Sequence, residues 1–499
     1  MSSPTPIARS SGILLHLTSL PGPFGIGDLG PGARQWLDSL AAARQRWWQV
    51  LPVVPTGYGD SPYQSPSTFA GNLNFLSPEV LAAEGLVSAT DVTACELPAG
   101  PIHYAAVIAA KKQLLALAYA RFRAGAAAAL RVPFQSFCDQ EAAWLNDYAL
   151  FVAIKDHMGG RPWWQWPQSL AQRDPDALRT IREKLAEAIE TYRFGQFLFF
   201  RQWTQLRAEA HQRGIRLLGD IPIYVADDSA DVWAHPELFL LDENRRPLFV
   251  AGVPPDYFSR TGQLWGNPVY DWNAHRRTVY RWWVARLQAT LRWVDLVRID
   301  HFRGIEAYWA VPAGDATAEN GRWVPGPREE LLEALRTALG QLPVVAEDLG
   351  FITPEVDELR ERFHLPGMRV LQFAFGGEVE ARFLPHRYSR NLLVTTGTHD
   401  NDTTRGWFEK LTAEERGAYE AYVPEATRDP VWALIRTGWA SVADVAVAPL
   451  QDVLELGSEA RLNTPGVASG NWVWRASEAQ ITDRTWIDRL AEYTQVYER

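Results

Sequence analysis

Residues 294–302, VDLVRIDHF, decide the predicted fold because a run of apolar side chains ends there in charged residues. In a β-strand the side chains alternate, so Val297 and Ile299 would share one face and Arg298 and Asp300 the other. The apolar face would pack under helices, which would place Arg298 and Asp300 in the lumen of a barrel. A charged pair there is costly to desolvate unless it is hydrogen-bonded, so this pair alone fits a structural ion pair at least as well as a catalytic site.

Other segments share the length and the Val-, Ile- and Leu-rich composition of 294–302. They are residues 12–17, 48–54, 215–225, 343–349, 368–375, 392–400 and 442–450. Near-continuous apolar runs of this length are typical of parallel strands that helices cover on both faces. Amphipathic segments such as 328–339 and 354–363 lie between several of them. About eight strands alternating with helices predict a (β/α)8 TIM barrel or a doubly wound sheet.

The uneven spacing of the predicted strands indicates insertions. Residues 75–210, between the second and third strands, are mainly helical in pattern. The helical patterns there cover residues 105–131, 142–157 and 177–214. Residues 226–290 form a second insertion, whose portion 228–275 is rich in Pro, Asp, Trp and Tyr and is typical of long active-site loops. We therefore predict one barrel unit over residues 1–499, interrupted by two insertions.

The composition argues against several classes of function. The chain has 59 acidic and 49 basic residues, a net charge of −10 and no block of Lys and Arg, which disfavours nucleic acid and membranes as partners. No run approaches the ~18 apolar residues of a membrane span, and the N-terminus lacks a signal-peptide pattern. The two cysteines, Cys95 and Cys138, form no zinc-binding or disulfide pattern, so we expect a cytoplasmic protein.

The tryptophan content is unusual, with 22 residues. Flat aromatic faces stack on the C–H faces of sugar rings, so many tryptophans together with many acids suggest sugar binding. A large core with a few interfacial tryptophans would explain the same composition equally well.

Acidic residues end three more of the predicted strands. These strands lie in segments 344–350 (VVAEDLG), 392–402 (LLVTTGTHDND) and 217–222 (LLGDIP). Their acids include Glu347, Asp400 and Asp220. The C-terminal ends of the strands of a barrel meet at one face, which is the catalytic face of that fold. Four acidic strand ends therefore favour a site over a structural ion pair.

Converging carboxylates suit either a metal ion or glycosidic cleavage. Metal-dependent hydrolases usually add histidines spaced as ligands, but His301 and His399 lie on different strands, and no phosphate loop supports a magnesium site. Glycoside cleavage requires one ionised and one protonated carboxyl group. Arg298 would keep Asp300 ionised as a nucleophile, and Glu347 could donate the proton if its site raises its pKa. We expect neither a metal nor a cofactor.

Three segments resemble the signature strands of the 4-alpha-glucanotransferases, the amylomaltases or disproportionating enzymes of family seventy-seven of the glycoside hydrolases. They are RIDHFRG at 298–304, AEDLG at 346–350 and TGTHDNDT at 396–403. Further agreement lies in HLTSLPG at 16–22, YGDSPYQ at 58–64, GDIP at 219–222 and GVPPDYFS at 252–259. The resemblance runs from about residue 12 to the C-terminus, with no departure at the motif positions.

The resemblance implies transfer of α-1,4-glucan segments from a maltooligosaccharide or starch-type donor to the 4-hydroxyl of a glucan or glucose. It implies a retaining double displacement, with Asp300 as nucleophile, Glu347 as general acid/base and Asp400 as transition-state stabiliser. The implied substrate-binding residues are Arg298, His399, Tyr63, Asp220, Tyr257, Phe258, Trp265, Asn267, Ser61 and Tyr58. The loop at 254–268 would cover the acceptor side. The expected partners are α-1,4-glucans and maltooligosaccharides.

Three other functions stay open at this point. An α-amylase-like hydrolase would use the same carboxylates with water as the acceptor. A glucan-binding barrel without activity and a metal-dependent barrel hydrolase fit the carboxylate set less well. The oligomeric state does not follow from the sequence.

Overall fold

The computed structural model describes residues 7–255, 259–375 and 381–499. Within these residues, eight parallel strands form a nearly closed barrel in the order β10-β11-β12-β1-β2-β3-β6-β9. The strands are β1 (Ser10–Leu14), β2 (Trp47–Gln49), β3 (Arg216–Pro222), β6 (Leu296–Asp300), β9 (Val344–Ala346), β10 (Gly367–Val370), β11 (Leu392–Thr395) and β12 (Val445–Pro449). Each overlaps one predicted segment. The predicted (β/α)8 barrel is confirmed, and the doubly wound alternative is wrong.

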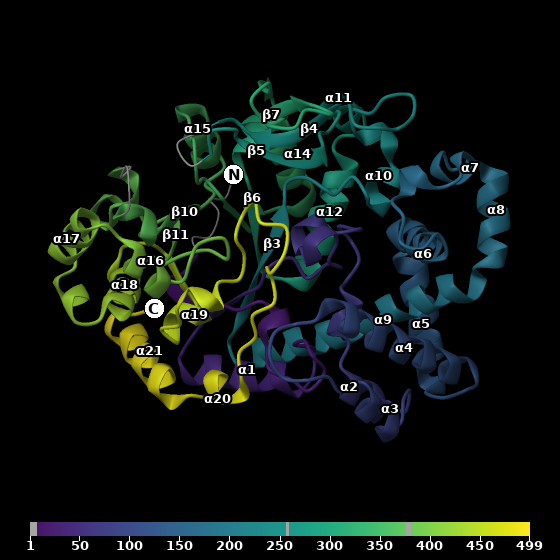
Figure 1. Ribbon diagram of the computed structural model, residues 1–499, viewed down its shortest axis with the longest axis horizontal. Coiled ribbons are helices and arrows are strands. Elements are labelled where there is room, and N and C mark those ends of the chain that lie inside the picture. The colour runs from purple at the N-terminus through teal and green to yellow at the C-terminus, as the bar shows by residue number, and fades with distance from the viewer. Residues whose placement is uncertain (1–6, 256–258, 376–380) are drawn as a thin grey trace.

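The barrel closes between its two edge strands, β9 and β10. The Ala346 N–H donates to the Pro366 carbonyl oxygen at 2.8 Å, which joins the end of β9 to the residue before β10. Figure 1 shows β3 and β6 running through the middle of the molecule, with helices on both sides of them.

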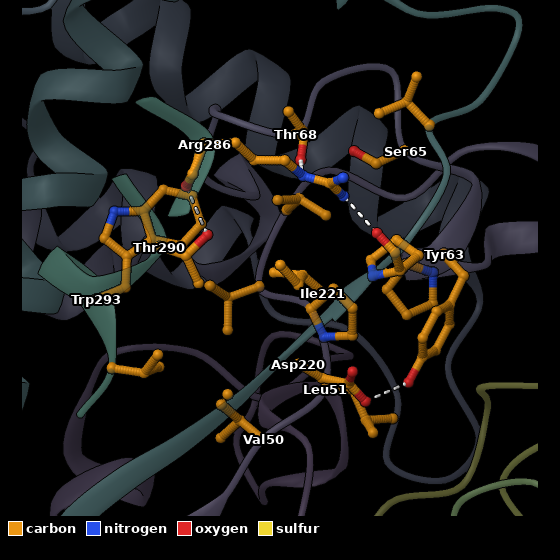
Figure 2. A pocket seen from close by; sticks show the side chains of 18 of the residues that line it. Val50, Leu51, Tyr63, Ser65, Thr68, Asp220, Ile221, Arg286, Thr290 and Trp293 are labelled. Atoms are coloured by element: carbon orange, nitrogen blue, oxygen red, sulfur yellow. Dashed lines mark hydrogen bonds between the residues drawn. The ribbon is translucent and has the colours of Figure 1, made fainter. Parts of the chain in front are cut away.

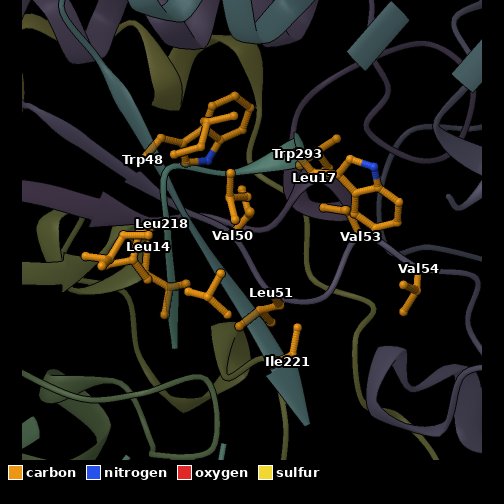
Figure 3. Packing of buried hydrophobic residues seen from close by; sticks show 14 of the residues in the cluster. Leu14, Leu17, Trp48, Val50, Leu51, Val53, Val54, Leu218, Ile221 and Trp293 are labelled. Carbon is orange, nitrogen blue, oxygen red and sulfur yellow. The ribbon is translucent and has the colours of Figure 1, made fainter. Parts of the chain in front are cut away.

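The barrel core is apolar and closely packed beside β3. Figure 3 shows side chains from β1, from β3 and from the segment that follows β2 meeting in one cluster. Leu14, Val50, Leu51, Leu218 and Ile221 are each at most 5% exposed. Burying a side chain of this size contributes about 1.5–3 kcal/mol, so this cluster fixes the strands whose ends carry the acids.

Helices connect β2 to β3 and cover the right side of Figure 1. They are α2 (Pro78–Ala83), α3 (Ala89–Ala94), α4 (Tyr104–Arg123), α5 (Arg131–Gln140), α6 (Ala142–His157), α7 (Gln168–Ala171), α8 (Pro175–Lys184) and α9 (Ala186–Gln212). Gln196 on α9 is buried and bonds both the N–H and the carbonyl oxygen of Gly71. The helical pattern predicted over 105–131 ends at Arg123, because Gly125 adopts a φ of +110° that no α-helix continues through.

A second, antiparallel sheet lies at the top of Figure 1 and was not predicted. Its order is β5-β4-β7-β8, with β4 (Phe249–Val253), β5 (Gln263–Pro268), β7 (Ala307–Pro312) and β8 (Arg322–Pro325). The expectation of loops over 228–275 is therefore wrong for β4 and β5. Both strands contain Gly or Pro, which are uncommon inside strands. In addition, β4 pairs with β7, which follows β6 in the chain, so the local sequence gives little sign of the sheet.

The remaining helices surround the barrel and the antiparallel sheet. They are α1 (Pro31–Ala42), α10 (Ala230–Ala234), α11 (Trp272–Arg277), α12 (Arg281–Trp293), α13 (Arg303–Glu306), α14 (Arg328–Leu339), α15 (Pro354–Arg362), α16 (Thr404–Lys410), α17 (Ala413–Tyr422), α18 (Pro430–Ala440), α19 (Leu450–Val453), α20 (Glu478–Ile481) and α21 (Arg484–Val496). Among the described residues, none of the helices has the length and apolar character needed to cross a membrane.

Candidate active site

The ends of β3 and β6 carry a buried chain of charges. The parallel register sets Asp220 beside Arg298 and Pro222 beside Asp300. Arg298 Nη1 donates to Asp220 Oδ2 at 2.6 Å, and Nη2 donates to Asp300 Oδ1 at 2.7 Å. Burial lowers the pKa of Arg298, but Asp220 and Asp300 outweigh burial and raise that pKa well above its usual value. The Asp300 carboxylate is thus oriented by a fixed cation while its side chain stays 31% exposed.

Asp220 lies at the inner end of this chain. It is 4% exposed, and it accepts a second hydrogen bond from the Tyr63 hydroxyl at 2.8 Å. Burial raises the pKa of Asp220 to about 6, because Arg298 does not fully offset the lost hydration and Asp300 adds repulsion. Asp220 therefore links the strand that carries Asp300 to the segment that carries Tyr63.

Glu347 follows β9, next to the end of β6. Its Oε2 accepts the His301 N–H at 2.6 Å, and its Oε1 accepts the Leu349 N–H at 2.8 Å. Burial, with the negative charge of Asp300, raises the pKa of Glu347 to about 7, against the opposing effects of Arg298 and the two N–H donors. This carboxyl group can therefore hold a proton near neutral pH, as an acid catalyst must.

His301 connects the ends of β6 and β9. Its φ of +53° lies in the left-handed region, which is unfavourable for a residue with a side chain. In this conformation its N–H reaches Glu347, and its ring meets Trp265 edge-on, with the ring centroids 4.8 Å apart. Burial lowers the pKa of His301 to about 4, so the ring is neutral in the pH range where Glu347 titrates.

Aromatic rings and a third acid lie across the barrel mouth. The Tyr63 ring stacks on His399, with centroids 5.0 Å apart and planes at 16°. His399 Nε2 lies 3.3 Å from Asp400 Oδ1, and Asn463 Nδ2 donates to the same oxygen at 2.5 Å. The Asp400 side chain is 44% exposed. A polar, accessible carboxylate beside flat rings suits a sugar with many hydroxyls.

Strand β5, which makes up the second half of the predicted 254–268 loop, is anchored beside these strand ends. Asn267 Nδ2 donates to the Val225 carbonyl oxygen at 2.8 Å, and Gln64 Nε2 donates to Asn267 Oδ1 at 3.3 Å. Trp265 contacts His301 as described above. The predicted residues Tyr257 and Phe258 lie outside the described residues.

Ser61 contacts the site residue Tyr63, whereas Tyr58 lies at the protein surface. Ser61 Oγ accepts the Tyr63 N–H at 3.2 Å and so begins the short helical turn Pro62–Gln64 that presents Tyr63. Tyr58 is 79% exposed, which leaves its ring available at the surface. Ser61 is therefore connected to the site through its hydrogen bond with Tyr63.

A small cavity lies behind the site, between β3 and α12. Figure 2 shows Tyr63 bonded to Asp220 on one side of the cavity and Arg286 bonded to Thr68 on another. Its volume of about 30 Å³ admits water but no sugar ring. The buried Arg286 also donates to the Ile223 carbonyl oxygen at 3.0 Å, so this region supports the end of β3. A ligand larger than a few waters therefore does not fit in this cavity.

The chain matches the 4-alpha-glucanotransferase family over residues 15–481. The chain belongs to the 4-alpha-glucanotransferase family. The Thermus thermophilus 4-alpha-glucanotransferase is 51% identical over 484 residues, which cover 95% of this chain and 96% of the relative. The Synechocystis 4-alpha-glucanotransferase is 50% identical over 497 residues, covering 98% of each. The solved amylomaltase of Streptococcus agalactiae, in complex with acarbose, superposes with a TM-score of 0.95 at 37% identity, covering 98% of this chain and 99% of its own.

These matches confirm the predicted enzyme class, a 4-alpha-glucanotransferase. Its site also contains residues that the sequence analysis did not single out. Trp472 lies 6.0 Å from Tyr63 and 5.8 Å from His399 between ring centroids, and Asn463 binds Asp400. Both come from the segment that follows β12. The aromatic sequence of residues 472–474, WVW, was the one available signal for Trp472, and Asn463 had none.

Asp348, beside Glu347, has a structural role in this glucanotransferase. It is fully buried, accepts the Met368 N–H at 2.6 Å and binds Arg369 Nη1 at 3.0 Å. These bonds join the end of β9 to β10. In residues 7–255, 259–375 and 381–499, no three His, Cys, Asp or Glu side chains are grouped to hold a metal ion.

Proposed function

We propose that this 4-alpha-glucanotransferase transfers α-1,4-glucan segments by a retaining double displacement. Asp300 is the nucleophile, Glu347 the general acid/base and Asp400 the transition-state stabiliser. One observation carries this assignment: Asp300 is paired with Arg298, whereas burial raises the pKa of neighbouring Glu347 to about 7. Two carboxyl groups with different protonation states are what retaining glycoside chemistry needs.

In the first step the glycosidic bond breaks. The Glu347 carboxyl proton passes to the glycosidic oxygen, and the departing glucan leaves with a free 4-hydroxyl group. An Asp300 carboxylate oxygen attacks C1 and forms a covalent glycosyl ester of inverted configuration. Glu347 is left as a carboxylate, with its oxygens still held by the His301 and Leu349 N–H groups.

In the second step the acceptor enters. The Glu347 carboxylate takes the proton of the acceptor 4-hydroxyl, whose oxygen attacks C1. The ester to Asp300 breaks, the α configuration is restored, and both carboxyl groups return to their starting states. Asp400 stabilises the positive charge that develops on the sugar ring in both steps.

The donor sugar is bound by Tyr63, His399 and Asp400. The stack of Tyr63 on His399 supports this assignment, because it fixes the orientation of both rings before substrate arrives. The structure of the Streptococcus agalactiae amylomaltase in complex with acarbose supports a saccharide ligand for this enzyme. Arg298 and Asp220 position Asp300, and Ser61 positions Tyr63.

The acceptor side is formed by the segment 254–268, whose strand β5 carries Trp265 and Asn267 beside the barrel strand ends. Tyr257 and Phe258 would stack on the acceptor and exclude water, which raises the effective concentration of the acceptor hydroxyl. Tyr58 contributes a sugar-stacking surface outside the cleft, consistent with its exposure. Cys95 and Cys138 are both free and buried, which supports a reducing, cytoplasmic location.

Incubation with maltotriose followed by product analysis tests the proposed activity. A transferase releases glucose together with maltooligosaccharides longer than the substrate. An α-amylase-like hydrolase gives shorter products alone, and a binding protein gives none. The Asp300→Ala variant serves as the control, since it must form neither class of product.

A further inference from the structure

Two exposed aromatic side chains flank one buried cation beside the barrel mouth. Phe351 is 68% exposed and Trp323 is 36% exposed, whereas Arg303 is 5% exposed. The Arg303 guanidinium carbon lies 3.8 Å from the centroid of the Trp323 ring and 5.8 Å from that of Phe351. Arg303 Nη1 also donates to the Phe351 carbonyl oxygen at 2.5 Å. We call these three residues the aromatic–arginine cluster.

This cluster is tied to both catalytic strand ends. Arg303 follows Asp300 by three residues, and Phe351 follows Glu347 by four residues. Four residues of chain span at most about 14 Å, so Phe351 lies within a few sugar units of the bond that is cleaved. Helix α13, which begins at Arg303, packs against α15, the helix after Phe351, and against β7, the strand that pairs with the strand of Trp323.

The order of the strands in the barrel indicates on which side of a bound glucan the aromatic–arginine cluster lies. Tyr63 follows β2, His399 follows β11 and Trp472 follows β12. In the circular strand order, β12 and β1 lie opposite β6 and β9, the strands that lead to Arg303 and Phe351. A bound glucan whose one end lies on Tyr63 and which passes the carboxylates therefore has its other end over the aromatic–arginine cluster.

An isolated exposed apolar side chain on a protein surface needs no explanation. Phe351 differs because a cation from the nucleophile-bearing strand end bonds its backbone and contacts its ring. The same guanidinium lies over Trp323, so ordering the two aromatic residues costs little when a ligand binds. Flat rings held in place beside the barrel mouth suit the C–H faces of sugars.

We propose that Phe351 and Trp323, held by Arg303, form an outer subsite for the α-glucan on the acceptor side. The acceptor side is indicated because Phe351 follows Glu347, whose proton goes to the departing glucan. This inference rests on the proposed function. It adds a chain-length preference: acceptors long enough to reach Phe351 bind better than glucose.

The test measures transfer from α-maltotriosyl fluoride, whose leaving group does not occupy the acceptor side. Apparent KM is measured for labelled maltotetraose and for labelled glucose as acceptors. In Phe351→Ala we expect the preference for maltotetraose, the ratio of KM for glucose to KM for maltotetraose, to fall at least about fivefold, the loss of an aromatic contact worth ~1 kcal/mol. Trp323→Ala should act in the same direction. Phe351→Tyr keeps the flat ring and should retain the parent ratio.

Val132→Ala is the matched control, because Val132 is 76% exposed on α5, away from the proposed cluster. An unchanged ratio in Phe351→Ala, or an equal change in Val132→Ala, overturns the outer subsite. A parent enzyme without transfer refutes the proposed function instead. Calorimetric binding of maltoheptaose in the Glu347→Gln background tests the subsite without turnover: affinity at least fivefold weaker with Phe351→Ala supports it, and equal affinity overturns it.

Discussion

Arg298 is the residue on which the charges at the strand ends depend. It bonds Asp220, whose side chain is fully buried, and Asp300 at once. We expect Arg298→Met to lower the free energy of unfolding by about 3–5 kcal/mol, because two neighbouring carboxylates lose their shared cation. Urea denaturation measures this loss of stability. The loss should be smaller at pH 5 than at pH 8, since protonation of Asp220 removes one charge. The double variant Arg298→Met, Asp220→Asn should recover part of the lost stability. A single variant as stable as the parent would contradict this view.

The raised pKa of Glu347 leads to a prediction about the pH dependence of the first step. Because its pKa is raised to about 7, the protonated form that the proposed first step needs is present below that pH and disappears above it. We expect kcat/KM for maltotriose to fall about tenfold per pH unit above neutral pH. Glycosyl fluorides need no proton donor, so with them this alkaline fall should be absent. The same fall with both donors would show that another group titrates.

At the residue scale, the sequence predicted the carboxylates and their neighbours but not every contact. Asp300, Glu347 and Asp400 could be found because each ends an apolar run. Trp472 and Asn463 were missed because they reach the site from the long segment after β12, and nothing in the local sequence places that segment beside His399 and Asp400. The left-handed backbone of His301 left no trace in the local sequence either.

At the scale of the element, apolar runs predicted the barrel strands well because both of their faces are buried. The antiparallel sheet escaped prediction because its strands are only partly buried, as β5 and β8 are, and so lack the continuous apolar runs of the barrel strands. We expect Leu218→Ala, in the centre of β3, to destabilise the fold by about 2–5 kcal/mol, since Leu218 is fully buried. Chemical denaturation measures this, with Val132→Ala on exposed α5 as the control. A loss below 1 kcal/mol would mean that β3 does not support the core.

The loop between β4 and β5 is predicted to exclude water from the site during transfer. Transfer exceeds hydrolysis only if an acceptor is held in line while water is excluded. We expect Tyr257→Ser and Phe258→Ala to lower transfer more than cleavage, so the share of free reducing ends rises. The ratio of transfer to hydrolysis on maltooligosaccharides measures this. If both activities fall in parallel, the water-excluding element lies elsewhere.

At the scale of the whole molecule, carboxylates and backbone N–H groups suffice for the proposed chemistry. Among the described residues, no acid or histidine cluster is arranged to hold a metal ion. We therefore expect dialysis against a chelator to leave transfer within about twofold of the untreated enzyme. Loss of activity that calcium or magnesium restores would show that a metal takes part.

The covalent glycosyl ester at Asp300 is the central claim of this account. In Glu347→Gln the second step lacks its base, so an α-glycosyl fluoride should form the ester and leave it intact. Mass spectrometry of the digested protein measures it directly. We predict a peptide containing Asp300 that is heavier by the transferred glycosyl group, and an unmodified peptide when Asp300→Ala is added. A glycosyl group on any other residue, or no modification while fluoride is still released, would contradict the account.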